Sequence, residues 1–204
     1  MKCDMRNHSF ANILGTVWDE KVFLLKFLQE NNSYFATHDF GDVPEHMLRQ
    51  IEKLSKSNLL DGVWHNFTVW KNIAAKSERF LHCILFQPPF LLSQIMSEKL
   101  GQGIEIKLLF GKNSDIPDCN DLVESLELNK IKTQEKIKKR IAENVGVNII
   151  MSEKECSLMF PQNGISDMHK SFVSGDPSFL QWCREFFCHK WNEGDDFSRL
   201  KTSL

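Results

Sequence analysis

The sequence predicts an α/β fold: a single-domain sandwich with a mixed sheet, N-terminal helices and a C-terminal amphipathic helix. Two short apolar runs, residues 81–86 and 104–110, alternate with helical patterns, which is typical of strands in a covered sheet. Residues 145–151 and 156–160 are two further apolar runs, separated by the four polar residues of a common hairpin loop. After this hairpin, residues 177–191 carry apolar side chains at helical spacing.

Composition places the chain among ordinary globular proteins of one domain. It has 204 residues, of which 42% are hydrophobic and 25% charged, with no internal repeat and no low-complexity linker. We expect an irregular lead-in over residues 1–16, a folded domain over 17–193 and a C-terminal tail over 194–204. The formal charge of −2 argues against a chain built to coat nucleic acid, which needs a basic excess.

The sequence shows no sign of a membrane or export segment. No apolar run approaches the roughly 20 residues of a membrane span, and the N-terminus lacks the apolar stretch of a signal peptide. The six cysteines are scattered and form no C-x-x-C pair, which is typical of free thiols in a reducing compartment. We therefore expect a cytoplasmic protein without membrane contact.

Two helices are predicted before the sheet. Apolar residues recur at helical spacing over residues 17–34. A second helix is indicated by Asp42 and Glu45, which have the spacing of a capping box, and Pro44 is tolerated in its first turn. The buried stripe of this second helix is predicted to be Met47, Leu48, Ile51 and Leu54.

The middle of the chain alternates between strand and helix patterns. A short strand around residues 59–63 is followed by a helix over 70–80. After the strand at 81–86, a helix over 89–100 is expected to end at Gly101, which is a plausible C-cap.

The segment before the hairpin is the most ambiguous part of the chain. We expect a helix over about residues 118–126, then a short strand near Ile131 and a basic helix that ends by 144. The basic cluster is Lys130, Lys132, Lys136, Lys138, Lys139 and Arg140. Acidic residues dilute it and no aromatic side chain interleaves for base stacking, so a solvated helix face is favoured over a phosphate-binding surface.

The C-terminal helix begins with a clear signal. Asp176 is a typical N-cap, and Pro177 takes the first helical position, where its missing N–H costs nothing. Trp182 and Trp191 lie near one apolar face of this helix. Core packing is the default reading, and lining an apolar ligand pocket or a dimer interface is the alternative. We expect Trp191, near the helix end, to face such a surface more readily than Trp182.

Three segments resemble one known family. Residues 34–45 (YFATHDFGDVPE) match an aromatic, then His-Asp, then Ile/Val-Pro signature, and residues 152–160 and 172–191 match the hairpin and the final helix. In their order and spacing they resemble the regulatory domain that follows a winged helix in archaeal transcriptional regulators, among them the FilR-type regulators of methanogens. The resemblance covers residues 17–192 and makes 17–193 the regulatory or effector domain.

The resemblance implies a non-catalytic sensor and dimerisation domain of an archaeal transcriptional regulator. Such regulators begin with a winged helix of about 60 to 80 residues, whereas about 16 residues precede the matching region here, so we expect no direct DNA binding by this chain. The expected partners are a small-molecule effector and either a second copy or a related full-length regulator. The sequence leaves open whether a winged helix was removed or is naturally absent.

Candidate ligand-binding residues are His38, Asp39, Trp182 and Trp191. His38 and Asp39 could form a proton-relay pair, although adjacent residues more often end a helix and shape the following loop. The alternative function is a small-molecule-processing α/β enzyme with divergent active-site residues, for which His38, Asp39 and His82 are the first suspects.

Catalytic, cofactor and metal patterns are not found in the sequence. It contains no G-x-S-x-G, Walker or G-x-G-x-x-G motif, and no histidine has a lysine two residues after it, as the His-x-Lys motif of phospholipase D-type domains requires. Cys183, Cys188 and His189 do not share a helix face and no second cluster completes a zinc site. We therefore expect no enzyme, no cofactor and no metal.

Overall fold

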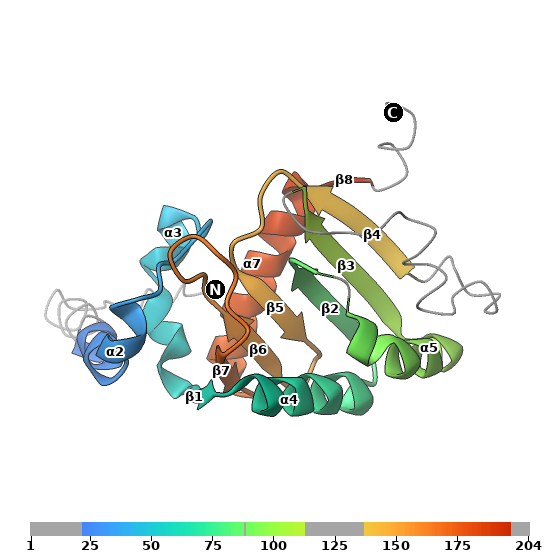
Figure 1. The fold of residues 1–204 in the computed structure, drawn as a ribbon, viewed down its shortest axis with the longest axis horizontal. Helices are drawn as coiled ribbons and strands as arrows, with labels where there is room; N and C mark the ends of the chain where they lie inside the picture. The colour runs from blue at the N-terminus through green and yellow to red at the C-terminus, as the bar shows by residue number, and fades with distance from the viewer. Residues whose placement is uncertain (1–21, 88, 113–136, 197–204) are drawn as a thin grey trace, which may run out of the picture.

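Eight strands form one mixed sheet, around which the helices pack (Figure 1). The computed structural model describes residues 22–87, 89–112 and 137–196. Within these ranges the strands are β1 (Asn58–Asp61), β2 (Phe80–Leu85), β3 (Glu105–Gly111), β4 (Ile137–Ala142), β5 (Asn148–Met151), β6 (Cys156–Met159), β7 (Lys170–Ser174) and β8 (Asp195–Asp196). Their order is β1-β7-β6-β5-β2-β3-β4-β8; β2, β3 and β4 run parallel, and all other neighbours are antiparallel. The predicted α/β fold with a mixed sheet is confirmed.

Helices cover both faces of this sheet. The long helix α7 (Pro177–Glu193) packs on one face, and α4 (Val63–Lys76), the 3-10 helix η2 (Phe90–Leu92) and α5 (Ser93–Gly101) pack on the other. Alternate residues of β2 show the division, because Ile84 belongs to the core on the α7 side while Cys83 and Leu85 belong to the core under α4 and α5. A strand buried on both faces reads as a continuous apolar run, which is why the central strands were predictable.

A separate group of short helices forms the N-terminal segment, defined here as residues 22–56. Residues 22–30 are helical and are followed by α2 (Asn32–Phe35), α3 (Glu45–Leu48) and the 3-10 helix η1 (Ile51–Lys56). The segment lies at the β1–β7 end of the sheet (Figure 1) and shares one core cluster with α7. Of the predicted stripe, Met47, Ile51 and Leu54 are buried and Leu48 is half-buried.

The predicted capping box is wrong. The N-cap of α3 is Pro44, no side chain caps the helix, and Glu45 is its first residue. Asp42 instead reaches across the fold: its Oδ1 accepts a hydrogen bond from the backbone N–H of Val147 at 3.2 Å, and its Oδ2 lies 2.9 Å from Lys190 Nζ. Asp42 therefore pairs with Lys190, 148 positions away in sequence, and not with the nearby N-terminus of α3.

The sequence prediction starts one helix too late and omits one strand. In each case a buried polar residue interrupts the apolar pattern on which the prediction depends. Helix α4 begins at Val63, not at residue 70, and the inward face of its early turns carries Asn66, which is fully buried. Strand β7 occupies Lys170–Ser174, where the sequence pattern predicts no strand. Ser171 of this strand is fully buried, and its hydroxyl is satisfied there because it donates to Asn66 Oδ1 at 2.7 Å.

The basic helix predicted to end by residue 144 is also wrong, because Ile137–Ala142 form strand β4, which pairs with β3. The strand expected near Ile131, the helix at 118–126 and the lead-in over 1–16 lie outside the described residues. Residues 195–196 of the expected tail form β8, and the tail beyond them also lies outside.

The hairpin and the final helix agree with their predictions. Strands β5 and β6 pair with Met151 opposite Cys156, and α7 begins at Pro177. The Asp176 carboxylate accepts a hydrogen bond from Ser178 N at 2.9 Å, as an N-cap does.

Candidate ligand pocket

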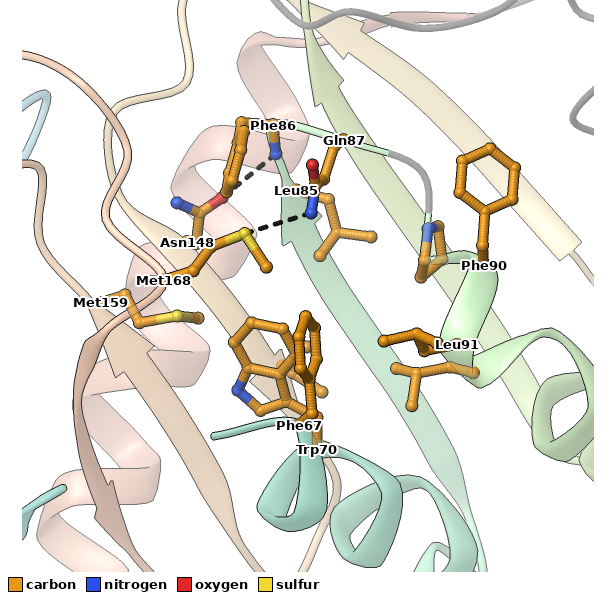
Figure 2. A pocket seen from close by; sticks show the side chains of 13 residues that line it. Phe67, Trp70, Leu85, Phe86, Gln87, Phe90, Leu91, Asn148, Met159 and Met168 are labelled. Atoms are coloured by element: carbon orange, nitrogen blue, oxygen red, sulfur yellow. Dashed lines mark hydrogen bonds between the residues drawn. The ribbon is translucent and has the colours of Figure 1, made fainter. Parts of the chain in front are cut away.

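An apolar pocket of about 130 Å³ lies beyond the carboxyl end of β2, between α4, η2 and the loop before β7 (Figure 2). The side chains that line it are Phe67, Trp70, Leu85, Phe86, Gln87, Pro89, Phe90, Leu91, Leu92, Asn148, Ile150, Met159 and Met168. An engineered cavity of about 150 Å³ with a similar apolar lining binds benzene, so this space suits a small ring.

Local sequence features build the walls of the pocket. Phe67 and Trp70 are three residues apart on α4 and therefore lie on one face of that helix. The indole Nε1 of Trp70 donates to Ser157 Oγ at 3.0 Å, which fixes the ring. Pro89 is the N-cap of η2, and this turn places Phe90 on the opposite side of the pocket (Figure 2). Open α/β sheets commonly bind ligands beyond the carboxyl ends of their strands.

Polar groups are few in the lining. Gln87 and Asn148 are its polar side chains, and no charged residue of the described chain contributes to it. Asn148 Oδ1 accepts a hydrogen bond from Phe86 N at 3.1 Å, while its Nδ2 is buried without a hydrogen-bond partner. Gln87 Nε2 donates to Met168 Sδ at 3.1 Å, and a thioether is a weak acceptor (Figure 2).

The structure pairs His38 with a residue far from it in sequence. His38 Nε2 lies 3.0 Å from Asp167 Oδ2, and both side chains are almost completely buried. Burial alone would raise the pKa of Asp167, but hydrogen bonds from His169 N and His38, and the charge of His38, bring it below its usual value. Asp167 immediately precedes Met168, which lines the pocket. His38 therefore contacts the sequence neighbour of a pocket residue.

Asp39 does not share this pair. Its carboxylate accepts hydrogen bonds from Gly41 N at 2.7 Å and Gly164 N at 3.3 Å, so it links two loops. The predicted candidates His38 and Asp39 are therefore neighbours with separate partners, and neither lines the pocket.

The two tryptophans of α7 occupy different environments, both away from the pocket. Trp182 is fully buried, and its Nε1 donates to Met47 O at 3.1 Å. Trp191 is half-buried; its ring stacks on Phe187, and the Arg140 guanidinium lies 4.9 Å from its centre. The structure thus does not bring the four predicted ligand residues together.

His82 lies under α7, apart from both the pocket and the His38–Asp167 pair. Its ring stacks between Phe80 and Phe187, and its Nε2 lies 3.3 Å from Glu105 Oε1. Burial first, and the charge of Lys107 next, lower the pKa of His82 to about 4. A hydrogen bond from Lys107 is the main reason why the pKa of Glu105 falls to about 2. This histidine is therefore uncharged near neutral pH.

Sequence reasoning missed the pocket. Its lining comes from five separated stretches of chain, and most of these side chains have the pattern of ordinary core residues. Asn148 gave the one available signal, since a polar residue interrupts the apolar run that became β5. Among the described residues, no His, Cys, Asp and Glu cluster could hold a metal ion, and no helix is long and apolar enough to cross a membrane.

Comparison of sequences finds no family model and no characterised protein that matches the chain. Its fold is found in solved structures. TrmBL2, an archaeal chromatin protein whose structure shows a novel mode of DNA binding, matches with a TM-score of 0.53 and 10% identity over 91% of this chain. The match covers 66% of TrmBL2, so the chain spans slightly less than two thirds of that protein.

Two bacterial proteins match the structure over nearly their whole length. NucT from Helicobacter pylori matches with a TM-score of 0.54 and 8% identity, and Nuc from Salmonella typhimurium, a phospholipase D family member, with 0.49 and 11%. Each match covers 70% of this chain and 99% of the other. The match to NucT contradicts our expectation that the chain is not an enzyme, because this fold forms nearly the whole of NucT.

Proposed function

We propose that this chain is a ligand-sensing domain of an archaeal-type transcriptional regulator, within the FilR-type family that its sequence resembles, and that the apolar pocket is its effector site. The match to TrmBL2 over 91% of the chain supports the regulator context. The observation that carries the proposal is the apolar pocket, because a sensor needs a site in which its ligand can bind.

The lining defines the effector. A charged group placed there would lack a partner of opposite charge, and burying an unpaired charge is costly. The proposed effector is therefore an uncharged molecule with a flat apolar body of about benzene size. The proposed regulatory domain is residues 17–193, and it acts as a dimer or with a related full-length regulator.

Fluorobenzene is a suitable probe, since fluorine NMR reports its binding directly. At a concentration about ten times its Kd it should stabilise the fold by about 1.4 kcal/mol and raise Tm by about 3–6 °C. Leu91 lines the pocket and is half exposed, so Leu91→Trp should block the mouth without unfolding the chain. Leu25→Trp, at an exposed position on the N-terminal segment, is the matched control and should bind normally. Equal binding by both variants would refute the pocket as the site.

A second candidate follows from the match to NucT, whose fold this chain shares. It is a small-molecule-processing enzyme with a divergent active site, in which the His38–Asp167 pair supplies acid–base chemistry. The phosphodiester bis(p-nitrophenyl) phosphate is the test substrate. Its hydrolysis by the wild type, lost in a folded Asp167→Asn variant, would support this second candidate. No hydrolysis by the wild type would count against the candidate as a phosphodiesterase.

A further inference from the structure

The loop before β7 connects the pocket with the N-terminal segment. We call residues 166–169 the strap. The Met168 side chain is a wall of the pocket, and the carboxylate of the preceding Asp167 lies 3.0 Å from His38 Nε2 (Figure 2 shows Met168). Adjacent strap residues therefore contact the pocket and His38, which lies three residues after the end of α2.

The far end of the strap is held by α4. The Asn66 Nδ2 amide donates to the carbonyl oxygens of Met168 and His169, each at 2.8 Å, and Gly62 N donates to the His169 carbonyl at 2.8 Å. The strap backbone is thus fixed on one side by a long helix. Side chains also hold the strap elsewhere: Asp167 pairs with His38, Met168 Sδ accepts from Gln87, and the Ser166 hydroxyl donates to the carbonyl oxygen of Gly146 at 3.5 Å. Of these contacts, the His38–Asp167 pair is the one that reaches the N-terminal segment.

Both nitrogens of His38 face hydrogen-bond acceptors. Nδ1 lies 2.9 Å from the carbonyl oxygen of Tyr34, and Nε2 faces the Asp167 carboxylate. The ring also stacks on the Tyr34 ring, with centroids 3.8 Å apart. A ring held at two edges and one face has little rotational freedom, so the position of Asp167 and the end of α2 depend on each other.

The N-terminal segment is suited to respond to such a contact. Its helices α2 and α3 have four residues each, and helices of this length are not stable without tertiary contacts. The order of these two short helices therefore depends on tertiary contacts, of which the His38–Asp167 pair is one.

We propose that His38 is a positioning residue for the pocket: through Asp167 it fixes the Met168 wall, so that pocket occupancy and ordering of the N-terminal segment favour each other. This inference rests on the proposed effector site. Because thermodynamic coupling is reciprocal, loosening the His38 contact must weaken ligand binding, and the ligand must tighten the contact.

The test measures fluorobenzene affinity by fluorine NMR in the wild type, His38→Gln, Asp167→Asn and a control. Ile51→Val is the matched control, since Ile51 is buried in the same segment, is not in the strap and loses one methyl group. We expect His38→Gln and Asp167→Asn to bind at least about five-fold more weakly, the low end of typical coupling, and Ile51→Val to bind like the wild type. Measurements are made below the melting transition, so that lost stability alone does not change Kd.

A second measurement uses the wild type alone. Saturating fluorobenzene should slow amide hydrogen exchange at residues 34–39 and 167–169 several-fold, with no such change in β4. Failure of fluorobenzene to bind the wild type overturns the proposed effector site, and this inference with it. Normal affinity in His38→Gln and Asp167→Asn, or unchanged exchange at residues 34–39 despite binding, overturns the coupling and leaves the site intact.

Discussion

Replacing Asp42 by alanine should destabilise the fold through Lys190 and Val147, not through loss of a helix cap. Lys190 is a buried lysine, and its Nζ has two carboxylate partners: Asp42 Oδ2 at 2.9 Å and Glu193 Oε2 at 2.8 Å. Burial alone would lower the pKa of Lys190, but its hydrogen bonds to Glu193 and Asp42 raise it above its usual value. The ammonium group therefore depends on these partners.

The magnitude follows from the geometry. Two unit charges 2.9 Å apart attract by about 6 kcal/mol at an effective dielectric constant of about 20. Desolvation and the remaining Glu193 contact offset most of this, which leaves a loss of about 1–2 kcal/mol. Removing the acceptor of the Val147 N–H adds about 1–2 kcal/mol. Asp42→Ala should thus cost about 2–4 kcal/mol, and Asp42→Asn, which keeps an oxygen for Val147, about 1–2 kcal/mol.

Urea denaturation followed by circular dichroism measures these differences, and Tm should fall by about 4–16 °C for the alanine variant. Glu45→Ala is the control, because a capping box would make Glu45 as important as Asp42, whereas the structure gives it an exposed ion pair with Arg49. Its cost should stay below about 0.5 kcal/mol. The reasoning is refuted if Asp42→Ala is neutral, or if Glu45→Ala and Asp42→Ala cost the same.

Two further predictions concern α7 and the sheet face below it. His82 has a pKa of about 4 in the fold against about 6.5 when unfolded, so the unfolded chain binds the proton first and stability falls as pH drops through this window. Between pH 7 and pH 5 the wild type should lose about 2 kcal/mol more than His82→Phe, as urea denaturation at the two pH values would show; equal losses would contradict this. Trp182→Glu should unfold the domain, since it places a charge in the core and removes the hydrogen bond to Met47, whereas Trp191→Glu, beside Arg140, should keep the fold. Circular dichroism and light scattering on both variants decide this, and unfolding of the Trp191 variant to the same extent would make that residue plain core.

The sequence by itself determined the elements whose causes are local. The β5–β6 hairpin was predictable because a four-residue polar loop separates two apolar runs, and the start of α7 because Asp176 and Pro177 act within one helical turn. The central strands were predictable because a strand covered on both faces must be apolar throughout. Periodicity failed at α4 and β7, where Asn66 and Ser171 are buried polar residues that satisfy each other across the core.

Tertiary structure decided everything that depends on partners distant in sequence. His38 was a plausible site residue from its neighbourhood, but its partner is Asp167, 129 positions away, and not the adjacent Asp39. Asp42 has the spacing of a cap, yet Lys190 and Val147 bind it instead. The pocket is formed by side chains whose individual patterns are those of core residues, and it exists because their packing leaves a space. Local spacing encodes hydrogen bonds within one turn of chain, whereas the competition between near and distant partners is settled when the whole chain folds.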